Sequence, residues 1–144
     1  MASLPIRWIV ARTYCQATEE ESRVIRALDS TLPLGETSRK AVEGQYGNPV
    51  IVLARRAVDA ADLRAVWKRW SQAGLVEAVR PTLRERVDDD AILHVRVDKQ
   101  QAFEGTLALA RGADMIDVQV KLKAYPARPE EIRRVAESLV SGGI

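Results

Sequence analysis

The alternation of apolar and polar positions predicts that the chain begins with a strand and then a helix. Apolar and β-branched residues run from Ile6 to Gln16, long enough for a first strand. Thr18 and Glu21 have the spacing of a capping box, so we expect the helix to begin there. Its apolar positions repeat at helical spacing to about Leu32, and Pro33 marks its end.

The next segment predicts a hairpin whose first strand is at the edge of a sheet. Gly35 to Glu43 is almost entirely polar, which is typical of an edge strand. The following Gly-Gln-Tyr-Gly-Asn-Pro is a turn sequence, and the apolar stretch from Val50 to Leu53 supplies the returning strand. We expect Tyr46 to be exposed in the loop, with Arg55 and Arg56 together at the far end of the hairpin.

Helical and strand periods alternate through the rest of the chain. Leu63, Val66, Trp67 and Trp70 fall on one helical face, so both tryptophans are expected in the core. The remaining predicted elements are a helix over 60–73, an irregular helical stretch over 75–87 bent at Pro81, a strand over 91–97, a short helix over 99–103 capped by Asp98, a strand over 115–123 and a last helix opened by Pro129.

This order of elements predicts a single α+β domain over residues 1–144. The succession β-α-β-β-α-α-β-(α)-β-α fits a mostly antiparallel sheet with helices packed on one face. A chain of 144 residues is within the range of one domain and buries enough surface to need neither metal nor disulfide for stability. The uncovered face of such a sheet is then free to bind a partner.

Composition narrows the class of protein without fixing its partner. The chain is 47% apolar and 29% charged with a net charge of +2, as expected of a globular protein. Its one cysteine excludes an intramolecular disulfide, and neither a signal peptide nor an apolar run of roughly 20 residues is visible, so we expect a cytoplasmic protein outside the membrane. Of its 22 basic residues, 17 are arginine. This bias suits phosphate and base contacts, and it also arises in a GC-rich or heat-adapted genome.

Few residue combinations indicate catalysis. His94 is the only histidine, and a structural or solvent-facing role is expected for it; Cys15 lies in the first strand as a buried thiol. Asp88–Asp90 with Glu85 would be the ligands of a metal-dependent nuclease, but consecutive carboxylates cannot all face one ion, and a solvated loop is the favoured interpretation. No nucleotide-binding or hydrolase motif occurs. We therefore expect no catalytic residue, no metal and no cofactor.

The candidate binding residues are mostly cations that are scattered along the chain. Folding can bring them onto one face that grips phosphate, although an ordinary solvated surface is an equal alternative. Tyr46 either stacks on a base or packs back on the sheet. The candidates are Arg39, Lys40, Tyr46, Arg55, Arg56, Lys99, Gln100, Lys121 and Lys123.

Five segments stand out in their order along the chain: Ala17–Glu19, Glu43–Pro49, Arg86–Asp88, Arg96–Gly105 and Lys121–Pro126. Together they resemble the archaeal RNA-binding-domain family that is described as predicted exosome subunits. The resemblance covers most of the chain and implies a fold similar to the ribosomal protein that binds five-S RNA, together with RNA binding and dimerisation. Gln45, Gln101 and Phe103 depart from the His, Ala and Tyr expected at these places.

The sequence thus predicts a non-catalytic protein that recognises structured RNA through its backbone and shape. The resemblance adds association with the exosome or another RNA-processing complex, and a homodimer. The alternative is a dimerisation or protein-interaction module of a larger complex that does not itself contact RNA. A metal-dependent nuclease is the third and least favoured hypothesis.

Overall fold

A computed structural model describes residues 4–44 and 46–141, and its centre is one five-stranded sheet. The strands lie side by side in the order β2-β3-β1-β5-β4, and every neighbouring pair is antiparallel. This confirms the predicted α+β class with an antiparallel sheet. The strands are β1 (Ile6–Cys15), β2 (Glu36–Glu43), β3 (Pro49–Ala57), β4 (Ile92–Asp98) and β5 (Met115–Leu122).

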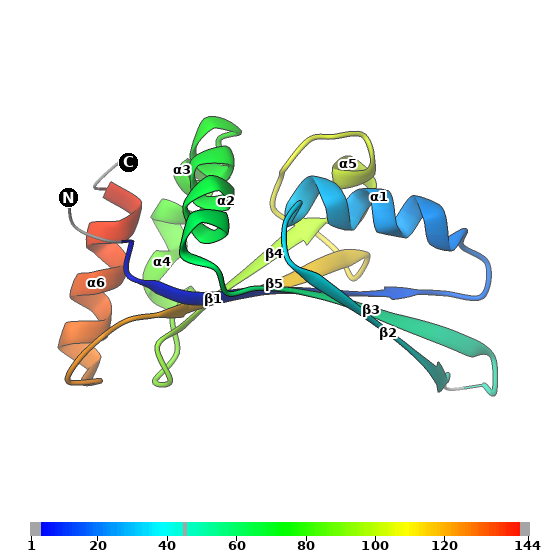
Figure 1. Cartoon of the computed structure of the whole chain (residues 1–144), viewed down its shortest axis with the longest axis horizontal. Helices are drawn as coiled ribbons and strands as arrows, with labels where there is room; N and C mark the ends of the chain where they lie inside the picture. The colour runs from blue at the N-terminus through cyan, green and yellow to red at the C-terminus, as the bar shows by residue number, and fades with distance from the viewer. Residues whose placement is uncertain (1–3, 45, 142–144) are drawn as a thin grey trace.

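The helices are distributed unevenly around the sheet (Figure 1). With the sheet seen nearly edge-on, α1, α2, α3 and α5 lie on one side of it, and α4 and α6 lie at the end near the termini. The opposite side of the sheet is not covered by a helix in this view. The helices are α1 (Glu21–Thr31), α2 (Ala60–Gln72), α3 (Leu75–Val79), the 3-10 turn η1 (Arg80–Thr82), α4 (Leu83–Arg86), α5 (Lys99–Phe103) and α6 (Pro129–Ser141).

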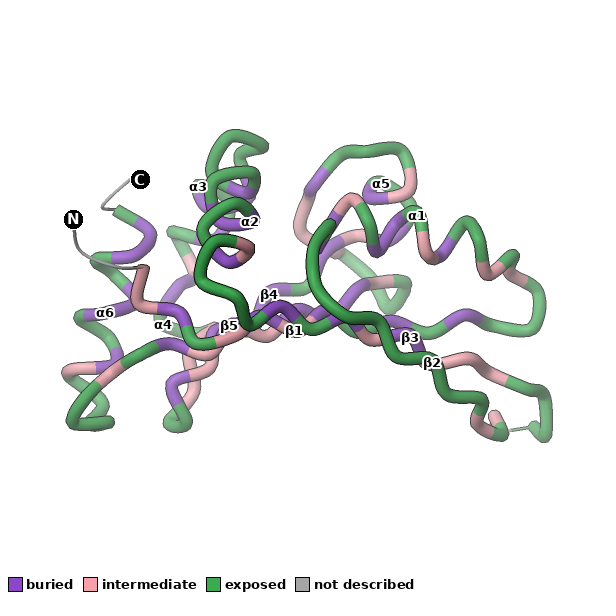
Figure 2. The backbone as a smooth tube through the Cα atoms, in the orientation of Figure 1, coloured by how far each residue is buried: buried purple, intermediate pink, exposed green. Residues whose placement is uncertain are grey.

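The core lies between the sheet and these helices, where Figure 2 shows the buried residues. Every second residue of β5 is buried, from Ile116 to Leu122. Trp67 and Trp70 of α2 are both buried, as predicted, with ring centroids 5.8 Å apart. The indole of Trp70 donates to the carbonyl of Thr31, 2.8 Å away, so its polar atom is satisfied inside the core. Each large apolar side chain buried here contributes about 1.5–3 kcal/mol.

The start of α1 differs from the prediction. The helix begins at Glu21 with Glu20 as its N-cap residue, and Thr18 does not cap it. The side chain of Glu19 instead accepts from the backbone N–H of Gln16 at 3.0 Å, which holds residues 16–19 in a turn before the helix. A capping-box spacing therefore predicted the helix correctly and its first residue wrongly.

The predicted hairpin is present, with β2 at the edge of the sheet. Val42 lies opposite Val50, and β3 runs on to Ala57, four residues beyond the expected strand. Gly35 enters β2 with φ +117°, and a Cβ there would lie 2.3 Å from the carbonyl oxygen of Arg56. Only glycine fits this approach of the two backbones.

Two other sequence expectations are confirmed between residues 75 and 103. The irregular helical stretch breaks into α3, η1 and α4, with Pro81 inside η1. Asp98 caps α5 by accepting from the backbone N–H of Gln101 at 2.9 Å. None of the helices in the described ranges is both long and apolar enough to cross a membrane.

Candidate nucleic-acid interface

The side of the sheet away from α1 and α2 carries a regular array of side chains, which we call the open face. In β1, Ile9 and Ala11 are buried toward the helices, so the alternate residues point the other way. The antiparallel register then assigns partners on every other strand to the same side. The open face comprises Trp8, Val10, Arg12, Tyr14, Glu36, Ser38, Lys40, Val42, Val50, Val52, Ala54, Arg56, Ile92, His94, Arg96, Asp117, Gln119 and Lys121.

Five cations on this face come from five different strands. Arg12 of β1 and Arg56 of β3 are diagonal neighbours on adjacent strands, because Arg12 lies opposite Ala54 and Arg56 lies opposite Val10. Such diagonal neighbours have backbone positions about 7–8 Å apart, so the two arginines belong to one patch of the sheet surface. The five are Arg12, Lys40, Arg56, Arg96 and Lys121.

Two aromatic rings share the open face, and each is accompanied by one of these arginines. The guanidinium carbon of Arg56 lies 5.6 Å from the centroid of the Trp8 ring, and that of Arg12 lies 5.9 Å from the Tyr14 ring. Tyr14 is 47% exposed. Flat guanidinium and aromatic groups at a solvated surface are the groups on which unpaired bases stack.

The acids of the open face leave an excess of positive charge. Asp88, in the turn before β4, hydrogen-bonds to His94, and Asp98 caps α5. Glu36 and Asp117 remain; in the part of the chain that the structure describes, neither forms an ion pair. Five cations therefore face two uncommitted carboxylates.

Arg55 and Lys99 correct the sequence expectation, because neither is a surface cation. Arg55 is 8% exposed and points to the helical side of β3, where it donates to Asp29 at 2.6 Å and to the carbonyl of Leu32 at 2.9 Å. Side chains alternate along a strand, so Arg55 and its neighbour Arg56 lie on opposite faces. The expectation that these two act together is wrong.

Lys99 is 6% exposed at the first residue of α5. Its Nζ donates to the carbonyl of Tyr14 at 3.0 Å and contacts carboxylate oxygens of Glu19 and Asp114, each at 3.0 Å. Burial would lower the pKa of Lys99, but the hydrogen bonds that it donates to these two acids raise its pKa above the ordinary value. These partners neutralise the Lys99 ammonium inside the protein, so the expectation that Lys99 is a surface cation that binds phosphate is wrong.

The other candidates lie apart from one another. Arg39 points to the helical side and pairs with Glu21 of α1 at 2.9 Å, which lowers the pKa of Glu21. Gln100 is exposed and donates to Asp114 at 3.2 Å. Tyr46 is 86% exposed at the tip of the β2–β3 hairpin, and Lys123 is exposed just beyond β5. Of the nine predicted residues, only Lys40, Arg56 and Lys121 share the open face.

The Asp88–His94 contact joins the turn before β4 to the open face. His94 Nε2 lies 2.7 Å from Asp88, whose carboxylate also accepts from the backbone N–H groups of Asp90 and Ile92. Partial burial would raise the pKa of Asp88, but these hydrogen bonds lower it below its ordinary value. Asp88 thus stabilises its own turn. In residues 4–44 and 46–141, no group of three or more His, Cys, Asp or Glu side chains is placed to hold a metal ion.

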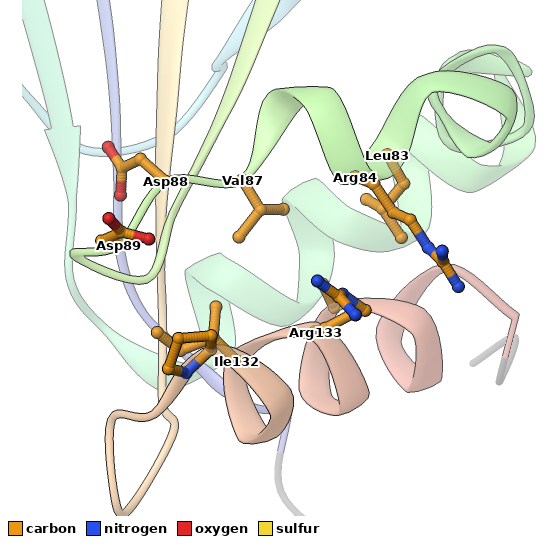
Figure 3. Close-up of a pocket in the computed structure, with 9 residues that line it drawn as sticks. Leu83, Arg84, Val87, Asp88, Asp89, Ile132 and Arg133 are labelled. Atoms are coloured by element: carbon orange, nitrogen blue, oxygen red, sulfur yellow. The ribbon is translucent and has the colours of Figure 1, made fainter.

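A hollow of about 80 Å³ lies between α4 and α6, beside the same turn. Figure 3 shows Asp88 and Asp89 at one end and Arg84 at the other, with Ile132 and Arg133 of α6 along its side. Small-molecule sites have volumes of about 300–1,000 Å³, so this hollow is too small for a nucleotide.

Sequence reasoning missed the arginines and aromatic residues that β1 and β4 contribute to the open face: Trp8, Arg12, Tyr14 and Arg96. A signal was present, because alternation along β1 and β4 places each of them opposite the apolar stripe. Proximity in the sequence groups residues of one segment, whereas the sheet brings together alternate residues of neighbouring strands.

Comparison with known proteins gives a consistent result. The model of a family described as RNA binding matches residues 8–122. An RNA-binding protein of Pyrococcus abyssi is 30% identical over 142 residues, covering 91% of each chain. Among solved structures, a DUF54 protein of Archaeglobus fulgidus has a TM-score of 0.83 at 29% identity, covering 93% of this chain and 99% of that one. A DUF54 protein of Methanothermobacter thermautotrophicus has a TM-score of 0.78 at 32% identity, with 92% and 98% covered. The chain therefore belongs to this RNA-binding (DUF54) family.

Proposed function

We propose that this protein binds structured RNA through the open face and acts without catalysis. The observation that carries the proposal is the placement of Arg12, Arg56, Arg96, Lys40 and Lys121 on one side of the sheet. The family description and the name of the Pyrococcus abyssi relative support RNA as the partner.

The open face offers two kinds of contact to RNA. Arginine and lysine neutralise phosphates and release counterions, which supplies affinity without regard to sequence. Tyr14 and Trp8 provide rings on which unpaired bases stack, while the backbone contacts fix the orientation of the RNA. The twisted sheet is about 20 Å wide, estimated from five strands at their usual spacing, which is broad enough to span one face of an RNA hairpin.

The proposal is tested by the binding of a fluorescent RNA hairpin of roughly 20 nucleotides with an unpaired loop. We expect affinity to fall as salt rises, and each of Arg12→Ala, Arg56→Ala and Arg96→Ala to weaken binding. A substitution that removes a phosphate contact, as expected for Arg56→Ala, also reduces the salt slope by about 0.7–0.9. Arg64→Ala on the exposed side of α2 is the matched control and leaves the affinity within about twofold. Undetectable binding at low salt, or equal effects of all four substitutions, contradicts the proposal.

The second candidate function is dimerisation or assembly into a larger complex. The edge strand β2 favours it, because within the described residues β3 is its one neighbour in the sheet, and seven of the eight residues of β2 are exposed. An edge of this kind can accept another strand. Sedimentation of the nuclease-treated protein tests this: a dimer that survives Lys40→Pro, which removes a backbone donor from β2, argues against pairing through this edge.

Association with an RNA-processing complex in the cytoplasm is a separate proposal, and it rests on the resemblance to predicted exosome subunits. Affinity purification from cells, with and without nuclease, tests it. Partners retained after nuclease treatment support direct protein contact. Partners lost with the RNA support an association through bound RNA alone.

A further inference from the structure

The row of open-face residues across β1, β5 and β4 contains an acid between two arginines. Asp117 of β5 lies directly opposite Arg12 of β1 and directly opposite Arg96 of β4. Side chains that face each other across antiparallel strands have Cβ atoms about 4.5–5.5 Å apart. The three groups therefore form one Arg-Asp-Arg row whose spacing is set by the backbone of the sheet.

The carboxylate of Asp117 has no partner in the described residues. No hydrogen bond or ion pair joins it to Arg12 or Arg96, although both are within reach of a rotamer change. The other acids around this end of the face have structural tasks, since Asp88 binds His94 and Asp98 caps α5. Asp117 lies at the centre of the open face and its side chain, unlike those of Asp88 and Asp98, makes no structural contact of this kind among the described residues.

A carboxylate repels a phosphate, but it can accept hydrogen bonds from the edge of a base. Its two oxygens accept two hydrogen bonds side by side. Guanine is the base whose Watson–Crick edge presents two adjacent donors, N1–H and the N2 amine, followed by the O6 acceptor. Adenine, cytosine and uracil each present one donor on that edge. An acid next to an arginine is thus complementary to guanine, because the arginine donates to O6.

The neighbouring ring completes this arrangement. Tyr14 lies two residues beyond Arg12 on the same face, and the Arg12 guanidinium already stands over that ring at 5.9 Å. Arg96 has no ion pair within the described ranges. Arg96 is therefore available to hydrogen-bond to a base. Arg12 and Tyr14 together form the surface on which a base stacks.

We propose that Asp117 and Arg96 read an unpaired guanine in the bound RNA. Asp117 accepts from guanine N1–H and N2–H, Arg96 donates to O6, and Tyr14 stacks on the base or its neighbour. This inference rests on the proposed RNA binding and adds base selection to it. Phosphate contacts from Arg56, Lys40 and Lys121 then hold the RNA without selecting its sequence.

The test uses three uridine nonamers that differ at the central base, which is guanine, hypoxanthine or adenine. Hypoxanthine keeps O6 and N1–H and lacks the N2 amine. For the wild-type protein we expect affinity about tenfold higher for guanine than for adenine, with hypoxanthine between them. Asp117→Asn reduces the preference to less than about twofold, because the amide replaces one acceptor with a donor.

Glu36→Gln is the matched control, since Glu36 is the other uncommitted acid of the open face and lies on edge strand β2. Both substitutions remove one negative charge, and both are expected to raise general RNA affinity. Only Asp117→Asn is expected to remove the guanine preference. Arg96→Gln is a second variant that leaves Asp117 in place and is also expected to lose the preference; circular dichroism verifies that each variant is folded.

The outcomes separate this inference from the proposed function. If the wild-type protein binds all three nonamers equally well, RNA binding stands and base reading is wrong. If Asp117→Asn keeps the wild-type preference, or Glu36→Gln loses it equally, Asp117 serves only to balance the charge of its two arginines. If no nonamer binds at low salt, base reading is wrong, and the RNA hairpin decides the proposed function: if the hairpin also fails to bind at low salt, both proposals are wrong.

Discussion

The Nζ of Lys99 lies 3.0 Å from a carboxylate oxygen of Glu19, and this contact fastens the start of α5 to the turn before α1. The same ammonium group holds Asp114 at 3.0 Å and the carbonyl of Tyr14 at 3.0 Å, so it links three separate segments. Removing a buried charged group that has several partners is costly, because those partners are left buried and unsatisfied. Lys99 is thus part of the framework that supports the back of the open face.

Lys99→Met is expected to destabilise the protein by about 2–3 kcal/mol, because Glu19 and the Tyr14 carbonyl lose their donor while the apolar volume is retained. Urea denaturation measures the effect. Lys68→Met on the exposed side of α2 is the control and changes stability by less than about 0.5 kcal/mol. Equal stability of the two variants would show that the Lys99 contacts contribute nothing.

The raised pKa of Lys99 gives a pH dependence with a definite sign. Its folded pKa is above the ordinary 10.5, so the stabilisation is fully present below pH 10.5 and is lost as the pH rises through the higher folded value. We expect the difference in unfolding free energy between wild type and Lys99→Met to shrink above pH 10.5. A difference that is constant or grows in this range would contradict the assignment.

Arg55 and Arg56 are adjacent in sequence, and substitutions at them are expected to act on different properties. Arg55→Ala removes the donor to Asp29, Leu32 and Thr37, and lowers stability by about 2 kcal/mol. In the folded population it leaves RNA affinity unchanged. Arg56→Ala has the opposite profile, with stability nearly unchanged and affinity reduced about threefold or more. Thermal unfolding and anisotropy on the same samples check both, and matching profiles would refute the two-sided placement.

Cys15 is expected to react slowly with alkylating reagents in the native protein. It is 4% exposed, and burial first and the nearby Glu19 second raise the pKa of its thiol, which reduces the thiolate fraction at neutral pH. Mass spectrometry after iodoacetamide treatment measures the rate. We expect rapid labelling in urea and labelling at least about tenfold slower in buffer; equal rates would mean that the end of β1 opens readily.

The sequence was sufficient for the elements and insufficient for the site. Strand and helix periods, together with Pro81 and Asp98, predicted the order of elements because these signals are local. The position of Lys99 depends on Glu19, 80 residues away in the chain, and no local pattern contains that contact. The same acid explains the late start of α1.

The residues of the open face can be predicted from the sequence only in part. Alternation from buried Leu53 places Arg55 inward and Arg56 outward, so the side of the sheet on which each arginine lies can be predicted from the sequence. That Arg12, Asp117 and Arg96 lie in one row follows from the strand order β1-β5-β4, which pairs the first strand of the chain with the last. Strand order is set by packing over the whole chain, and the sequence pattern does not contain it.

The central claim is that RNA occupies the open face, and titration of the isotope-labelled protein with RNA by nuclear magnetic resonance tests it most directly. With the guanine-containing nonamer we predict that the largest shift changes fall on Arg12, Tyr14, Arg56, Arg96 and Asp117. Residues on the exposed sides of α1 and α2 should change little. Shift changes concentrated on those helices, with the open face unaffected, would contradict the account.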